Sequence, residues 1–194
     1  LLQNRDVTIT DRLAAALSFA EKIQAQLERK DYISQIEACV FENGQNQSVQ
    51  GKTALCGLLS IYQSLEPLDL AWIQRLKQVE EKINVLAEKS ALFTEKNPEL
   101  CNDYEQLSVY FIHRYWLRAG EDQDVLGKVH LMLASILIIR LLELEMWCDK
   151  GELTRANQIE VVKAYSKEIE YSEQNIEALA EASLEHPAFL RENL

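Results

Sequence analysis

One apolar segment limits how this chain can fold more than any other feature of its sequence. Residues Leu131 to Ile139 are strongly apolar, and they are bounded by His130 and Arg140. The segment is far shorter than the roughly 20 apolar residues that a membrane-spanning helix needs. We therefore expect a buried helix in the core of a folded protein, and no insertion into a membrane.

The composition is typical of an all-α protein. Hydrophobic residues make up 47% of the 194 residues, and there are only 6 Gly and 3 Pro to interrupt helices. A chain of this length can bury one sizeable core, so we expect residues 1–194 to form a single compact bundle of six or seven helices. Because the chain begins Leu-Leu-Gln, without Met or a signal peptide, we interpret it as a C-terminal fragment of a larger protein.

Charge and cysteine spacing exclude several classes of function. A formal charge of -11 argues against nucleic acid as a partner, since binding to phosphates relies on Lys and Arg. A basic partner is compatible with this charge, but solubility alone also explains it. The four cysteines are isolated in the sequence, which indicates reduced thiols in a cytoplasmic protein and no metal site in this chain. They are Cys39, Cys56, Cys101 and Cys148.

Hydrophobic periodicity, capping residues and helix breakers place the expected helices. The predicted ranges are 9–29, 31–40, 52–65, 68–93, 99–118, 122–148 and 155–184. The polar stretch 42–51, rich in Asn and Gln, is predicted to be an exposed loop. Helix 99–118 is apolar nearly all round between Leu107 and Leu117, so we predict that it lies in the middle of the bundle and ends at Gly120.

No catalytic centre is recognisable. The run Gly51-Lys52-Thr53 ends like a phosphate-binding loop, but the glycine that this loop needs further upstream is out of register. The three histidines lie on different predicted elements, which does not favour a metal site. No Ser or Cys sits in a nucleophile motif.

Two polar groups on predicted helices form the candidate site. Arg114 shares a helix face with Leu107 and Phe111, and a guanidinium buried there needs a partner. The last helix carries a polar strip at helical spacing, formed by Tyr165, Glu168, Ser172 and Asn175, with Glu170 as a further carboxylate. One interpretation is an Arg114–Glu168 ion pair that only joins two helices. The other is a substrate-binding groove in which carboxylates and hydroxyls accept a cationic side chain.

Several segments resemble the C-terminal part of flagellin lysine-N-methylases. They are Val109–Trp116, Asp124–Val129, Ile138–Arg140 with its Leu-rich continuation to Trp147, Tyr165–Asn175 and Phe189–Leu194. Arg114, Tyr165, Glu168, Ser172 and Asn175 match the family pattern. The family usually has His at the position of Tyr171 and an aromatic residue at that of His113.

The resemblance implies a protein that transfers a methyl group from S-adenosylmethionine to lysines of flagellin in the cytoplasm. It also implies an iron–sulfur cluster bound by a cysteine-rich motif of an N-terminal half, which this chain would contact. We expect neither the cluster nor S-adenosylmethionine to be held by residues 1–194 alone, and we expect this fragment to be inactive by itself.

Three roles remain open from the sequence. The chain could recognise flagellin or complete an active-site wall, it could be a non-catalytic helical interaction or scaffold module, or it could only cover the N-terminal half.

Overall fold

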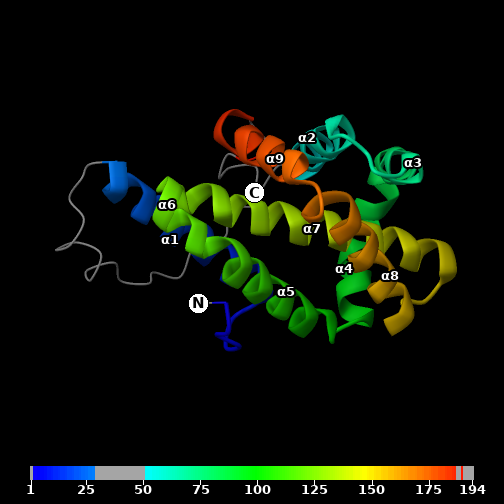
Figure 1. The fold of residues 1–194 in the computed structure, drawn as a ribbon. Coiled ribbons are helices and arrows are strands. Elements are labelled where there is room, and N and C mark those ends of the chain that lie inside the picture. The colour runs from blue at the N-terminus through cyan, green and yellow to red at the C-terminus, as the bar shows by residue number, and fades with distance from the viewer. Residues whose placement is uncertain (1, 29–50, 187–188, 190–194) are drawn as a thin grey trace.

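The computed structural model describes residues 2–28, 51–186 and 189, and the regular structure in these ranges is helical, without strands (Figure 1). The helices are α1 (Ile9–Glu28), α2 (Gly51–Ser64), α3 (Leu70–Glu81), α4 (Ile83–Lys96), α5 (Leu100–Tyr115), α6 (Ala119–Asp122), α7 (Val125–Lys150), α8 (Arg155–Tyr165) and α9 (Glu173–Glu185). A 3-10 turn, η2 (Trp116–Arg118), follows α5, and a π-helical segment, η3 (Ser166–Glu170), follows α8. The predicted all-α class is confirmed. The predicted helix 31–40 and loop 42–51 fall, apart from Gly51 at the start of α2, outside the described residues.

Helix α7 is the centre of the fold. It contacts α1, α3, α4, α5, α8 and α9, and in Figure 1 it crosses the middle of the molecule with the other helices around it. The segment Leu131–Ile139 is buried along almost its whole length, as the sequence predicts. The prediction that helix 99–118 lies in the middle of the bundle is wrong, because α5 leaves Tyr110 and Arg114 exposed and the following Leu117 is 82% exposed.

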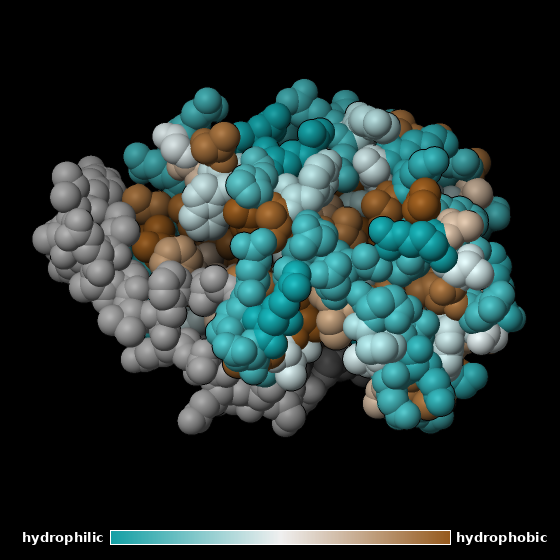
Figure 2. Space-filling model, turned by 90° about the horizontal axis from the view of Figure 1, so that it is seen from below, coloured by the Kyte–Doolittle hydropathy of each residue, from teal (hydrophilic) through white to brown (hydrophobic). Residues whose placement is uncertain are grey.

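Among the described helices, α7 alone is long and apolar enough to cross a membrane by length and composition. However, 78% of its most apolar window is buried inside the fold. Packing against the surrounding helices therefore accounts for its composition. On the face drawn in Figure 2, apolar residues show as separate patches among hydrophilic ones.

The ends of several helices follow the predicted signals. Thr8 caps α1 by accepting a hydrogen bond from the Asp11 N–H, and Thr154 forms a capping box with Asn157 at the start of α8. Gly151, in the left-handed conformation at φ 79°, ends α7. Gly120 does not end a helix as predicted, because α5 has already stopped at Tyr115 and Gly120 lies inside α6.

Two predicted helices are each divided, so the count exceeds the predicted six or seven. The range 68–93 separates into α3 and α4 at Lys82, whose ammonium binds Glu145 at 2.8 Å and Asp149 at 2.7 Å on α7. The range 155–184 separates into α8, η3 and α9. Neither break contains Gly or Pro, so the usual helix-breaking signals are absent from the sequence.

A buried chain of hydroxyl groups joins α2, α7 and the end of α8. Tyr165 donates a hydrogen bond to Ser135 Oγ at 2.7 Å, and Ser135 donates to the Leu131 carbonyl at 2.6 Å. Because the one hydrogen of the Tyr165 hydroxyl is used in this way, the Tyr62 hydroxyl at 2.9 Å is the donor to Tyr165. Tyr165 is therefore a core residue and not part of an open groove.

We predict that Tyr165→Phe lowers the free energy of unfolding by about 1 to 2 kcal/mol, since it leaves the buried Tyr62 hydroxyl without its acceptor. Chemical denaturation followed by circular dichroism measures the change. The matched control is Tyr171→Phe, the same substitution at a side chain that is 79% exposed, and it should have little effect. An equal loss of unfolding free energy in both variants would contradict the buried hydrogen bond between Tyr62 and Tyr165.

A carboxyl group is buried where α5 meets α7. Glu143 is 2% exposed and accepts a hydrogen bond of 2.6 Å from the Tyr104 hydroxyl. Burial raises the pKa of Glu143 to about 7, and nearby Asp103 adds to the rise, while the Tyr104 hydrogen bond and the charges of Arg140 and Arg155 oppose it. In the folded protein this group is therefore protonated well above its ordinary pKa of 4.5.

This raised pKa predicts a pH dependence of stability. Between pH 4.5 and about 7 the unfolded chain releases the Glu143 proton while the folded chain keeps it, so rising pH favours unfolding. Relative to Glu143→Gln, the wild-type free energy of unfolding should fall by up to about 3 kcal/mol across this range and then level off. Urea titrations at several pH values test this, with Glu152→Gln, at an exposed position, as the control. If the difference in unfolding free energy between wild type and Glu143→Gln did not change with pH, the raised pKa of Glu143 would be refuted.

Candidate functional site

Glu168 holds the start of α3 rather than a substrate. Its carboxylate, 2% exposed, accepts hydrogen bonds from the backbone N–H groups of Leu68 at 2.8 Å and Asp69 at 3.2 Å. A carboxylate in this position satisfies free backbone donors and interacts favourably with the positive end of the helix. The predicted Arg114–Glu168 ion pair is wrong, because Arg114 binds Glu170 instead.

Asn175, on α9, also holds the segment between α2 and α3 in place. Its side-chain oxygen accepts the Glu66 N–H at 3.0 Å, and its amide donates to the carbonyls of Glu66 at 2.9 Å and Glu168 at 2.8 Å. Ser172 caps α9 by accepting the Asn175 N–H at 3.2 Å. Together these residues join α9 and η3 to the segment between α2 and α3, which is a structural role.

Arg114 and Glu170 come together at the surface. The Arg114 Nε atom lies 3.1 Å from Glu170 Oε2 and 3.3 Å from the Tyr115 hydroxyl. Arg114 is 46% exposed, so the sequence-based prediction of a buried guanidinium is wrong, whereas the Glu170 side chain is only 5% exposed. Glu168 and Glu170 are two positions apart in η3 and point to different neighbours, Glu168 towards α3 and Glu170 towards α5.

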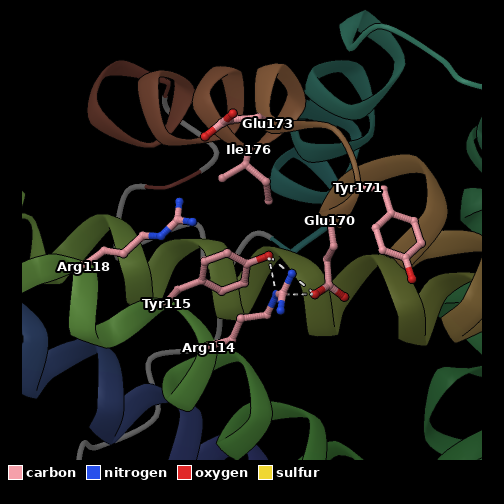
Figure 3. A pocket seen from close by; sticks show the side chains of 7 residues that line it. All are labelled: Arg114, Tyr115, Arg118, Glu170, Tyr171, Glu173 and Ile176. Carbon is pink, nitrogen blue, oxygen red and sulfur yellow. Dashed lines mark hydrogen bonds and ion pairs between the residues drawn. The ribbon is translucent and has the colours of Figure 1, made fainter.

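These two residues belong to a half-open cleft of about 280 Å³ between the C-terminal end of α5 and the start of α9. Figure 3 shows the side chains around it, which come from α5, η2, η3 and α9. The lining residues are Arg114, Tyr115, Arg118, Glu170, Tyr171, Glu173 and Ile176. Of the predicted site residues, only Arg114 and Glu170 line this cleft.

The Glu170 carboxylate is fixed through one of its two oxygens. Oε2 accepts a hydrogen bond of 2.6 Å from the Tyr110 hydroxyl, a longer one of 3.5 Å from Tyr115, and the contact with Arg114. Burial and the nearby Glu170 raise the pKa of Tyr110 to about 12, so its hydroxyl stays protonated as a donor at neutral pH. In the described part of the chain, no donor occupies Oε1.

Sequence reasoning missed the other cleft residues. Tyr115 and Arg118 lie close to Arg114 in the sequence, but their shared position depends on the 3-10 turn η2 that ends α5. Ile176 lines the cleft as a partly buried apolar residue of α9. Tyr171 is not among the site residues that the sequence predicts.

No metal centre occurs among the described residues, since no group of three or more His, Cys, Asp or Glu side chains could hold a metal ion there. Cys56, Cys101 and Cys148 are free thiols on α2, α5 and α7. Cys39 lies outside the described ranges. The described cysteines therefore do not fit an iron–sulfur cluster, which needs several thiolates close together.

Fold and cleft together define an all-α protein with a charged surface site. The family model described as FliB lysine N-methylase C-terminal domain matches residues 1–189. The chain therefore belongs to this family, which confirms the resemblance to lysine N-methylases of flagellin. No curated protein and no solved structure matches the chain.

We predict that Asn175→Ala destabilises the fold by about 2 to 4 kcal/mol, because it leaves the buried Glu168 carbonyl and two part-buried backbone groups of Glu66 without these partners. Thermal and urea unfolding measure the loss. Gln174→Ala, at the exposed neighbouring position on α9, is the control and should change stability little. If Asn175→Ala kept full stability, the structural role given to this residue would be wrong.

Proposed function

We propose that this chain takes part in the methylation of flagellin lysines and that its cleft binds a lysine side chain of flagellin. Membership of the FliB lysine N-methylase C-terminal domain family supports the reaction class. The observation that carries the binding role is the Glu170 carboxylate, which lines the cleft, is nearly buried, and is held by Tyr110 and Arg114 through Oε2.

The geometry suits an ammonium group. A lysine Nζ carries three donors and one positive charge, and a carboxylate that is already oriented loses little freedom when it accepts one of them. The ring of Tyr115 and the side chain of Ile176 can cover the four-carbon stem of a lysine, while Tyr171 stands exposed at the edge of the cleft. The cleft thus combines a charged end with apolar sides.

We propose further that the methyl donor is S-adenosylmethionine and that another part of the enzyme holds it together with the iron–sulfur cluster. Methyl transfer needs a neutral amine in line with the sulfonium. A lysine bound as the ammonium ion at Glu170 is not yet the nucleophile. The role proposed for this cleft is therefore to capture and orient the substrate, before or beside the reacting lysine.

A scaffold role is the second candidate. It is favoured by Glu168, Asn175 and Tyr165, three residues that match the family pattern and serve to join helices. In that case the chain supports the rest of the enzyme, and flagellin binding does not depend on the cleft.

We predict that Glu170→Gln weakens binding of purified flagellin about tenfold or more, because a hydrogen bond to a charged group is replaced by one to a neutral amide. Isothermal titration calorimetry on the chain, without S-adenosylmethionine, measures the affinity. Glutamine keeps the shape of the side chain and can still accept from Tyr110, so folding should be preserved and circular dichroism checks it.

Two controls sharpen this experiment. Glu177→Gln removes the same charge at an exposed position on α9 and should leave the affinity unchanged. Flagellin with acetylated lysines has lost its ammonium groups and should not bind. Flagellin binding that survives acetylation, or that Glu170→Gln and Glu177→Gln affect equally, would rule out the lysine site and favour the scaffold role.

A further inference from the structure

We propose that the cleft selects lysines that have an acidic residue close by in the flagellin sequence, and that Arg118 is the residue that binds the acid. This inference rests on the proposed function, because it names the class of flagellin segment that the same cleft accepts. Arg118 is then a specificity-determining residue that touches the substrate away from the lysine.

Arg118 differs from the other arginine of the cleft in its contacts with the described residues. Arg114 is bound to Glu170 and to the Tyr115 hydroxyl, and its guanidinium lies over the Tyr115 ring, 5.6 Å from the centroid. Within the described residues, Arg118 makes no hydrogen bond or ion pair, although Glu173 lines the same cleft. Its guanidinium is therefore free to form a two-point contact with a carboxylate.

The free groups of the cleft have opposite charges and different positions. Figure 3 shows Arg118 and Glu170 on opposite sides of the Tyr115 ring. In this proposal Glu170 binds the cation and Arg118 binds the anion, so a ligand that carries only one charge uses only one of the two residues. A lysine with a neighbouring Asp or Glu supplies both charges in one short segment.

The arrangement also disfavours flagellin segments in which the lysine lies beside another basic residue. A lysine beside a second basic residue brings a like charge towards Arg118, which weakens binding. Arg114 does not relieve this repulsion, because it is itself positive and already engaged with Glu170. The cleft therefore distinguishes flagellin lysines by their neighbours, not only by the ammonium group.

The experiment compares three labelled peptides of equal length by fluorescence anisotropy. Each contains one lysine, followed at the same position by Asp, Asn or Arg. The chain should bind the Asp peptide about threefold to fivefold more tightly than the Asn peptide, as expected for an exposed ion pair, and the Arg peptide more weakly than either. Arg118→Gln should abolish the preference, and Arg118→Glu should reverse it in favour of the Arg peptide.

Lys77→Glu is the matched control, since it reverses a charge at an exposed position on α3 and should leave the preference unchanged. Glu170-dependent binding with equal affinity for all three peptides would overturn the role of Arg118 and leave the lysine site standing. Loss of the Glu170 dependence itself would remove the proposed function as well.

One further measurement tests whether the cleft binds a different ligand that carries both charges. The amino-acid end of S-adenosylhomocysteine also carries an ammonium and a carboxylate. If S-adenosylhomocysteine displaces the peptides from the chain and Arg118→Gln prevents this, the cleft belongs to the methyl donor and the peptide assignment is wrong. Unchanged peptide binding in the presence of S-adenosylhomocysteine supports it.

Discussion

The burial of α7 is the constraint on which the rest of the structure depends. Its apolar surface has to be removed from water on all sides, and this requirement brings α1, α3, α4, α5, α8 and α9 around it. Two groups of polar side chains that enter this core are joined by hydrogen bonds. The Tyr62–Tyr165–Ser135 chain ends on a backbone carbonyl, and Glu143 is bound by Tyr104.

The cleft depends on the segment between α8 and α9. Side chains two positions apart in a helical segment point to different sides, so Glu168 and Glu170 meet different partners. In η3, Glu168 reaches the start of α3 and Glu170 reaches Arg114 and Tyr110. The structural carboxylate and the cleft carboxylate thus come from one short segment, which ties the position of the site to the stability of the fold.

The candidate site could be predicted only in part. The sequence indicates Arg114 as a charged residue on an apolar helix and Glu170 as a further carboxylate of the candidate site, and the structure brings the two together. Arg114 was paired with Glu168 because a regular helix placed Glu168 on the strip with Tyr165, Ser172 and Asn175. In the structure Tyr165, Glu168 and Asn175 are buried and Ser172 caps α9, because the helix is interrupted at η3 and starts again after Ser172.

The sequence by itself determined the all-α class, the burial of Leu131–Ile139 and the helix ends at Thr8, Thr154 and Gly151, because these follow from local hydrophobicity, capping and backbone preference. Only the tertiary structure decided the break at Lys82, whose ion pairs lie on α7, far away in the sequence. It also decided the cleft, whose residues come from four elements. Contacts between distant segments outweigh weak local preferences, and a sequence pattern does not contain them.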